Sequence, residues 1–231
     1  IARRLLDIRE NSGLVQLGTV WLPVPHLLLA PLVIPLFMWR TGWGAAVLGA
    51  ACMSLTAVGL YRATARWGAR RAGRLTAVAV ALLNPNMLYL SATALTEPVL
   101  IAAMSLTLAG LANLATRHRM SSPGEVAIFC GIPASLAALS RYEGWALALT
   151  GALFLAVMTY RRTSGDLRVT LLTIGGFVTP PVLATGWWVG FNWVVFHNPL
   201  EFLNGQYSAN AQQSAILAQG TSTKLDIVST V

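Results

Sequence analysis

The sequence predicts an all-α, polytopic membrane protein: a transmembrane helical bundle of about six spans with one further interfacial or re-entrant helix. Of the 231 residues, 55% are hydrophobic and only 10% are charged, whereas soluble domains carry about 25% charged residues. The mean hydropathy is +0.63. The apolar residues form runs separated by short arginine-bearing loops, and several runs approach the roughly 20 residues that cross a bilayer as a helix. Lipid is therefore the expected solvent for most of the chain.

The first 42 residues are expected to form an external loop that carries a juxtamembrane helix. Their apolar run, residues 23–39, is short for a full span and is interrupted by Pro23, Pro25, Pro31 and Pro35. A full crossing would place residues 1–22 in the cytoplasm, whereas a helix that dips into the membrane or lies in the interface leaves them outside. We predict the second arrangement.

Six apolar runs between residues 43 and 190 are expected to form the transmembrane bundle. Four are continuous and predict ordinary spans at 43–61, 98–116, 145–160 and 169–190. Two are weaker, because Asn84-Pro85-Asn86 interrupts residues 75–90 and Gly131 and Pro133 interrupt residues 126–140. Residues 191–231 are expected to be an external segment. Residues 1–231 are then one transmembrane domain, which we expect to be cut from a longer protein at both ends.

The arginines predict the orientation of the bundle. They gather in three loops, which the positive-inside rule places together in the cytoplasm: Arg62, Arg66, Arg70, Arg71 and Arg74, then Arg117 and Arg119, then Arg161, Arg162 and Arg168. The alternate loops, near residues 91–97 and 141–144, are then external.

The net charge, the cysteines and the absence of certain motifs argue against several other classes of protein. The net charge of +8 does not indicate a nucleic-acid partner, because the arginines lie in loops and not on one face beside base-reading groups. Cys52 and Cys130 lie inside apolar runs, where a thiol behaves as a small hydrophobe. No Walker loop, dinucleotide fingerprint, paired-cysteine zinc motif or Gly-x-Ser-x-Gly elbow is present, so soluble-nucleotide chemistry is unsupported.

Glu97 is the first candidate for chemistry, because it opens an apolar run at the external end. Thr96 is expected to cap the helix that follows, Pro98 suits its first turn, and Glu97 lies where the helix dipole favours a carboxylate. An ordinary helix start explains the same pattern. Ionisable groups at membrane depth are costly, however, and indicate function.

A second group of charged and aromatic residues lies between two apolar runs. Arg141 can bind a phosphate bidentately at low dielectric, and Tyr142 beside it is a candidate for substrate contact. The alternative is a structural ion pair of Arg141 with Glu143 or Glu97, and the two interpretations are compatible. We predict that Glu97, Arg141 and Glu143 converge at one external cavity.

Further substrate contacts are expected from aromatic and polar residues near this cavity. Trp21 and His26 are placed on its rim, where prolines rigidify the entry to the juxtamembrane helix. A lone histidine in an apolar segment is, however, more often a structural hydrogen-bond donor than a base or ligand. Gln206 and Tyr207 lie in an external stretch whose amide, hydroxyl and aromatic groups suit sugars or head groups, although an ordinary polar loop has the same composition.

These motifs together resemble the C-class (GT-C) membrane glycosyltransferases, which take sugars from polyprenyl-phosphate donors. The sequence is especially similar to the bacterial branch that includes protein O-mannosyltransferases and the lipid A aminoarabinose transferase, and the similarity spans essentially the whole chain. Its most specific parts, in their order and spacing, are Trp21-Leu22-Pro23-Val24-Pro25-His26, Asn84-Pro85-Asn86 with Ala94-Leu95-Thr96-Glu97-Pro98, and Ser140-Arg141-Tyr142-Glu143-Gly144-Trp145.

The resemblance implies a multi-pass glycosyltransferase of a bacterial plasma membrane. It would transfer a sugar from a polyprenyl-phosphate-linked donor to an acceptor hydroxyl on the external face, with that donor and membrane lipid as partners. An inverting transfer needs a carboxylate to take the hydroxyl proton and a cation to stabilise the departing phosphate. Glu97, Arg141 and Glu143 are therefore the catalytic candidates.

One departure from the family concerns its catalytic aspartate, which normally lies early in the first external loop. Here that region is expected upstream of Ile1, and Asp7 is the nearest carboxylate. By the same resemblance, Glu97 matches the acidic residue that opens the helix after the second external loop, and Arg141 a basic residue that contacts donor phosphate. A divalent metal ion is a further candidate ligand, with no ligand set assigned.

Two other functions fit the same sequence. A transporter or flippase of a lipid-linked or small polar solute would use Asn84-Pro85-Asn86 and Gly131 with Pro133 as broken-helix binding elements. The absence of an inverted repeat and the outward bias of the acidic residues argue against it. A non-catalytic membrane subunit would keep the bundle without the carboxylate that performs catalysis.

Overall fold

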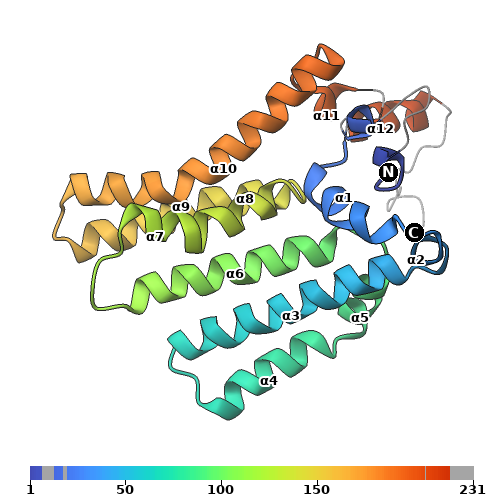
Figure 1. Ribbon diagram of the computed structural model, residues 1–231. Coiled ribbons are helices and arrows are strands. Elements are labelled where there is room, and N and C mark those ends of the chain that lie inside the picture. The colour runs from blue at the N-terminus through green and yellow to red at the C-terminus, as the bar shows by residue number, and fades with distance from the viewer. Residues whose placement is uncertain (7–12, 18–19, 206, 219–231) are drawn as a thin grey trace, which may run out of the picture.

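Four long helices form the body of the molecule (Figure 1). The computed structural model describes residues 1–6, 13–17, 20–205 and 207–218, and all regular elements in this part of the chain are helical. The helices long and apolar enough to cross a bilayer are α3 (Trp43–Arg66), α6 (Glu97–Thr116), α9 (Glu143–Arg162) and α10 (Leu167–Phe196), which lie along one another. The predicted all-α membrane bundle is confirmed.

A fifth span is broken at the proline that the sequence indicated. Helices α4 (Arg71–Leu82) and α5 (Pro85–Ala92) together meet the requirements of one span, but they are bent by 59°. Asn84 is extended at this break and accepts a hydrogen bond from the Asn86 backbone N–H at 2.9 Å. A residue before proline avoids the helical conformation, so the chain bends here and restarts with a capped helix.

The sixth expected span is shorter than the others and contains a π-helical turn. It consists of α7 (Pro123–Val126), the π turn η4 (Ala127–Gly131) and α8 (Ile132–Ala138). Pro133 lacks an N–H and its ring crowds the carbonyl four residues earlier, that of Phe129, and the wider π turn lies over this position. Of the six predicted spans, four are long helices and one is the bent pair, so the described residues hold four or five candidate spans, and Pro123–Ala138 is a shorter apolar helix.

The N-terminal segment is helical but does not form a full span, as predicted. Helix α1 (Pro23–Leu29) continues into the 3-10 turn η3 (Ala30–Val33), and α2 (Leu36–Thr41) starts after the break at Pro35. The apolar helix Pro23–Val33 reaches about 16 Å at 1.5 Å per residue, about half of a hydrocarbon core. Figure 1 shows α1 and α2 at one end of the bundle.

Short elements complete the chain at both ends. The 3-10 turns η1 (Arg4–Leu6) and η2 (Gly13–Gln16) precede α1, and α11 (Glu201–Asn204) and α12 (Ala209–Ala218) follow α10. Helix α10 extends to Phe196, so the segment that was predicted to be external from residue 191 begins inside a helix. In Figure 1 the second half of α10 turns away from α9, and Pro180 and Pro181 lie within this helix.

Small residues allow the helices to approach one another closely around α6. Helix α6 is the centre of the bundle, since 61% of its apolar window is buried against 22–33% in the other three long helices. A Cβ atom added to Gly59 of α3 would lie 2.6 Å from the Ser105 backbone of α6. In lipid, where apolar burial gives little driving force, such close packing holds helices together.

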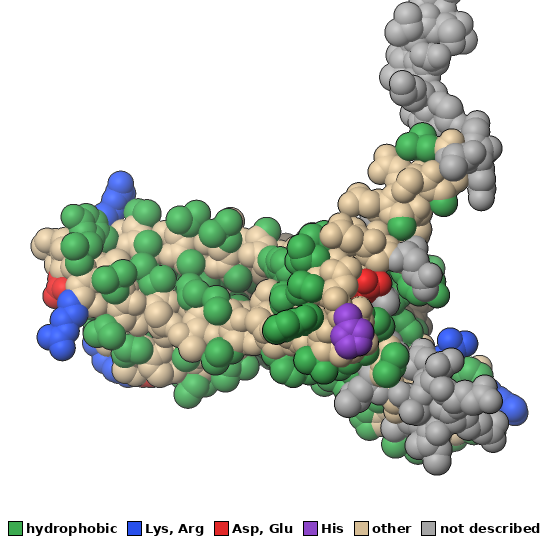
Figure 2. All heavy atoms as spheres, turned by 90° about the horizontal axis from the view of Figure 1, so that it is seen from above, with side chains coloured by type: hydrophobic (Ala, Val, Ile, Leu, Met, Phe, Trp, Pro, Cys, Tyr) green, Lys and Arg blue, Asp and Glu red, His purple; other side chains and the backbone are tan. Residues whose placement is uncertain are grey.

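The three arginine-bearing loops lie at one end of the bundle, as their distribution predicts. Figure 1 places the α3–α4, α6–α7 and α9–α10 connections at this end, called the arginine end, and the α5–α6 and α8–α9 connections at the opposite end, called the site end. Figure 2 shows Lys and Arg side chains at both ends of a body that is covered mainly by hydrophobic ones. Leu149 and Leu183 are 64% and 68% exposed on that body, as expected of lipid-facing side chains.

Candidate functional site

A pocket of about 160 Å³ opens at the site end, where three segments distant in sequence meet. The stretch before α1, the start of α6 and the α8–α9 connection each contribute to its wall. The lining residues are Val20, Trp21, Leu22, Thr96, Ser140, Arg141, Tyr142 and Glu143.

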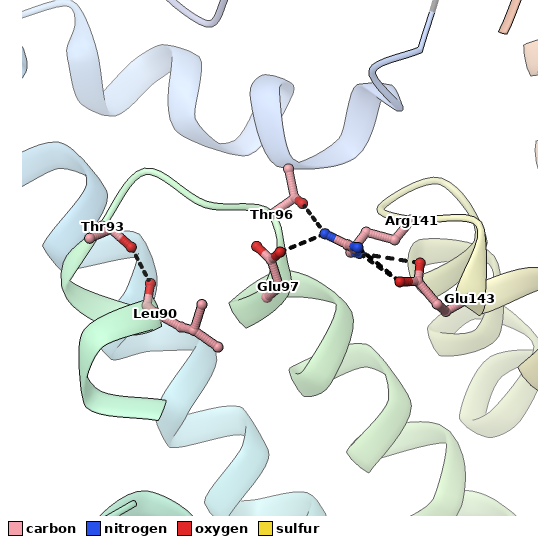
Figure 3. A network of polar contacts seen from close by, with 6 residues as sticks. All are labelled: Leu90, Thr93, Thr96, Glu97, Arg141 and Glu143. Atoms are coloured by element: carbon pink, nitrogen blue, oxygen red, sulfur yellow. Dashed lines mark hydrogen bonds and ion pairs between the residues drawn. The ribbon is translucent and has the colours of Figure 1, made fainter. Parts of the chain in front are cut away.

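Arg141 connects the two carboxylates that the sequence singled out (Figure 3). Its Nη1 donates to Glu97 Oε1 at 2.6 Å, and its Nη2 donates to Glu143 Oε1 at 2.8 Å. Its Nε lies 3.2 Å from both carboxylate oxygens of Glu143. The structure therefore brings Glu97, Arg141 and Glu143 together, and the ion pair that the sequence allowed involves both glutamates.

The backbone around Arg141 is fixed by the packing of α9 on α8. Gly144 allows this contact, because a Cβ atom there would lie 2.2 Å from the Ala137 backbone carbon. The Arg141 N–H donates to the Ala137 carbonyl at 3.1 Å, and the Gly144 N–H donates to the Arg141 carbonyl at 3.0 Å. The turn therefore points the guanidinium toward the start of α6.

The charges of the site do not cancel, because two carboxylates surround one guanidinium. The hydrogen bond with Glu143 raises the pKa of Arg141 above its usual value, so this group stays cationic. The Glu97 side chain is 30% exposed and that of Glu143 is 56% exposed. Glu97 Oε2 is buried and has no hydrogen-bond partner in the described residues. An unsatisfied buried carboxylate oxygen is costly. Glu97 lies behind Thr96 and Arg141 and is not itself among the residues that line the pocket.

Thr96 differs from its predicted role. It occupies the N-cap position of α6, but its side chain makes no capping hydrogen bond. Its Oγ1 instead accepts from Arg141 Nη1 at 3.4 Å. Thr96 adopts helical backbone angles, φ −88° and ψ −18°, whereas a capping side chain usually needs an extended residue at this position. Pro98 and Glu97 lie in the first turn as predicted.

Tyr142 anchors the pocket to the rest of the site end. Its hydroxyl donates to the Val20 carbonyl at 3.2 Å, and its ring stacks on Phe202 with centroids 5.5 Å apart. Trp145 meets both rings edge-on, at 5.5 and 5.7 Å. Burial raises the pKa of Tyr142 to about 12, so the phenol remains a donor. Tyr142 thus lines the pocket and also holds its wall in place.

Trp21 and His26 lie together beside the pocket. Their rings meet edge-on with centroids 6.2 Å apart, and Trp21 is 52% exposed at the pocket wall. His26 Nε2 is buried without a hydrogen-bond partner among the described residues. Burial lowers the pKa of His26 to about 4, so the ring is neutral at pH 7. The interpretation of His26 as a satisfied structural donor does not hold for Nε2.

The predicted contacts of the C-terminal segment are not part of the described pocket. Gln206 and Asp7 lie outside the described residues. Tyr207 is 56% exposed and does not line the pocket. Among the described residues, no three His, Cys, Asp or Glu side chains form a group that could hold a metal ion.

An apolar groove of about 570 Å³ lies between α9 and the second half of α10. Trp145, Leu149, Pro181, Val182 and Val189 are among the residues that line it. Trp145 belongs to the groove and touches Tyr142 of the pocket. The sequence did not predict this groove, although the paired prolines at 180 and 181 mark the place where α10 diverges.

The broken helices that a transporter would use lie away from this site. Asn84, Pro85 and Asn86 are all exposed on the outside of the bundle. Gly131 packs against α10, where a Cβ atom would lie 2.8 Å from the Phe177 carbonyl oxygen. Neither element lines the pocket at the site end.

Comparison with known families yields one match. A family model described as dolichyl-phosphate-mannose-protein mannosyltransferase matches residues 23–188, which is well over half of the chain. A search of curated proteins and a search of solved structures both find no match. The matched range includes α1, Glu97, Arg141 and the start of the second half of α10.

Proposed function

Since the chain belongs to the dolichyl-phosphate-mannose-protein mannosyltransferase family, and is thus a multi-pass membrane glycosyltransferase, we propose that its donor is a polyprenyl-phosphate-linked sugar. The acceptor is a hydroxyl group presented on the external face of the plasma membrane. The observation that carries this proposal is Arg141, which lies between two carboxylates in a pocket beside an apolar groove.

The chemistry of transfer requires the groups that meet at Arg141. The acceptor oxygen attacks the anomeric carbon, the bond from that carbon to the phosphate oxygen breaks, and polyprenyl phosphate leaves with the electron pair. The hydroxyl proton passes to a carboxylate, and a guanidinium stabilises the charge that grows on the phosphate. Arg141 supplies the cation, and the free Oε2 of Glu97 is a hydrogen-bond acceptor that orients the acceptor hydroxyl.

Phosphate binding requires a rearrangement of one carboxylate. Arg141 has five N–H groups, and those at Nε and Nη2 face Glu143. Glu143 is the more exposed partner, and its contact with Arg141 spans only two residues. We propose that the donor phosphate displaces Glu143 from Arg141, while the more buried Glu97 keeps the guanidinium in place.

The groove between α9 and α10 suits the isoprenoid part of the same donor. Its walls are largely apolar, and Trp145 and Tyr142 separate it from the charged pocket. A lipid that lies in this groove would extend its head toward Arg141 across the aromatic pair. One donor would therefore contact both features, which is the reason to treat them as one site.

The test compares Arg141→Ala and Arg141→Lys in the full-length protein, purified in detergent and supplied with a polyprenyl-phosphate sugar, mannose first. We expect Arg141→Ala to lower the transfer rate by roughly 100-fold or more, as loss of a charge-stabilising donor does. Arg141→Lys should recover only part of the rate, because an ammonium cannot bind phosphate bidentately.

Arg161→Ala, an exposed arginine at the opposite end, is the matched control. Membrane content and thermal unfolding of each variant show whether the bundle survives. Near-normal transfer by a folded Arg141→Ala protein would refute the role of Arg141. No transfer by the wild-type protein with any polyprenyl-phosphate sugar would refute the donor class.

A further inference from the structure

A second and larger pocket, of about 510 Å³, lies at the arginine end of the bundle. It is formed by α3, α6 and the short helix that contains the π turn. Its walls include Arg62, Arg66, Asn113, Arg117, Ile128 and Phe129. The transfer reaction proposed above uses none of these residues.

The pocket carries uncompensated positive charge. Arg62 and Arg66 are four residues apart, so they project from the same face of α3, and neither has an ion pair or hydrogen bond within the described part of the chain. Arg117 lies 3.6 Å from Glu125, but Glu125 also pairs with Arg119 at 2.5 Å. Glu125 is the acidic residue of the lining, against three arginines. An anion is therefore the expected ligand.

A neutral polar group also lacks a partner in this wall. The Asn113 Oδ1 atom is buried and makes no hydrogen bond within the described residues. Buried amide oxygens are normally satisfied by protein or ligand groups. A hydroxyl of a bound molecule, such as that of a glycerol head group, is a suitable donor.

The pocket is charged at one end and apolar at the other. Along α6 its wall runs from Arg117 inward to Leu106, eleven residues or about 16 Å of helix. Ile128 and Phe129 lie beside it and are 58% and 57% exposed on the lipid-facing surface. This depth exceeds what a free phosphate ion would occupy, and it matches a molecule with an anionic head and acyl chains.

The helix packing builds this shape. Gly110 has no side chain, and a Cβ atom there would lie 2.3 Å from the Phe129 carbonyl oxygen of the π turn. Helix α6 and the π turn therefore touch at the floor of the pocket, below the arginines. The π turn also directs Ile128 and Phe129 outward, where they border the entrance from the membrane.

We propose that this pocket binds the head group of an anionic glycerophospholipid from the leaflet at the arginine end. Arg62, Arg66 and Arg117 contact the phosphate, Asn113 accepts from a head-group hydroxyl, and an acyl chain lies along Ile128 and Phe129. Basic pockets between transmembrane helices bind anionic lipids in this manner. The positive-inside tendency explains the side on which these arginines lie, but not the gathering of three of them around one cavity.

The test measures lipid binding to the full-length protein in detergent. Phosphatidylglycerol is compared with zwitterionic phosphatidylcholine and with inorganic phosphate, by native mass spectrometry and by the thermal unfolding midpoint. We expect phosphatidylglycerol alone to bind stoichiometrically and to raise the midpoint. The double variant Arg62→Gln/Arg66→Gln should weaken its binding about fivefold per arginine, and so about 25-fold in total.

Arg70→Gln/Arg71→Gln is the matched control, because it removes the same charge from the nearby start of α4 without touching the pocket. It should bind phosphatidylglycerol like the wild-type protein. Equal weakening in both double variants would refute a specific site, and an equal effect of inorganic phosphate would refute a lipid ligand. These readouts do not depend on sugar transfer, so the donor proposal can fail without affecting this one.

Discussion

Arg141 and Glu97 form the contact on which the geometry of the site end depends. They lie 44 residues apart in sequence, and their side chains join at 2.6 Å. Both are about one-third exposed, so solvent screens the attraction and its stabilising effect is modest. The main effect of the ion pair is on position, because it holds the start of α6 next to the α8–α9 turn.

His26 leads to a prediction about pH. Its folded-state pKa is lowered to about 4 by burial, below the unfolded value of about 6.5. A neutral His26 therefore stabilises the fold fully above about pH 6.5, and this contribution falls as the pH decreases toward 4. We expect His26→Gln to lose less stability than the wild-type protein between pH 7 and pH 4.

Tryptophan fluorescence during thermal unfolding in detergent, at each pH, would measure this difference. The two proteins differ only at residue 26, so the difference between variant and wild type, and not either midpoint alone, reports on His26. If the two midpoints fall in parallel, His26 is not held neutral by the fold.

At the scale of elements, the contact of α8 with α9 determines where Arg141 points. Gly144 lies at this contact, directly beside the Ala137 backbone. A methyl group cannot fit there unless the helices separate. The shift would move the turn between them, which carries Arg141.

Gly144→Ala should therefore destabilise the bundle by about 1–3 kcal/mol, in the range of overpacked contacts. Gly175→Ala is its control, because a Cβ atom at Gly175 in α10 would meet nothing within 4 Å. Cys52 and Cys130 are buried and free, so a thiol-reactive dye reports unfolding without added labels. Equal unfolding midpoints for the two variants would contradict the close contact at Gly144.

At the scale of the whole molecule, the two ends of the bundle should face opposite sides of the membrane. Leu95 is exposed in the α5–α6 connection at the site end, and Arg70 is exposed in the α3–α4 connection at the arginine end. In a Cys52→Ala/Cys130→Ala background, we expect Leu95→Cys to react with an impermeant maleimide on intact cells. Arg70→Cys should react only after permeabilisation, and labelling of both on intact cells would overturn the predicted orientation.

The sequence predicts the membrane-spanning helices well, because whether a segment crosses the bilayer depends mainly on its own apolar residues. The four long helices begin within two residues of their predicted starts, and α10 ends six residues later than predicted. Counting the membrane crossings between Glu97, Arg141 and Glu143 places all three at the same end of the bundle, which predicts their convergence.

The partners of each side chain depend on how the helices rotate and cross, which the sequence pattern does not specify. Thr96 has cap chemistry but accepts from Arg141 instead. Tyr142 reaches the Val20 carbonyl across 122 residues. The gathering of Arg62, Arg66 and Arg117 around one pocket likewise depends on the meeting of α3, α6 and the π turn, so charge counting assigns these residues a side of the membrane but not a site.

The long sequence separation of the Arg141 contacts also sets the order in which the site is made. Glu97 is synthesised 44 residues before Arg141, an interval of roughly 2 to 9 seconds at about 5–20 residues per second. Tyr142 is synthesised 122 residues after Val20, whose carbonyl accepts its hydrogen bond, which is roughly 6 to 24 seconds later at the same rate. During biogenesis the start of α6 therefore sits at the membrane surface with a carboxylate that lacks its guanidinium. The pocket closes only after the ribosome has delivered the α8–α9 hairpin into the bilayer.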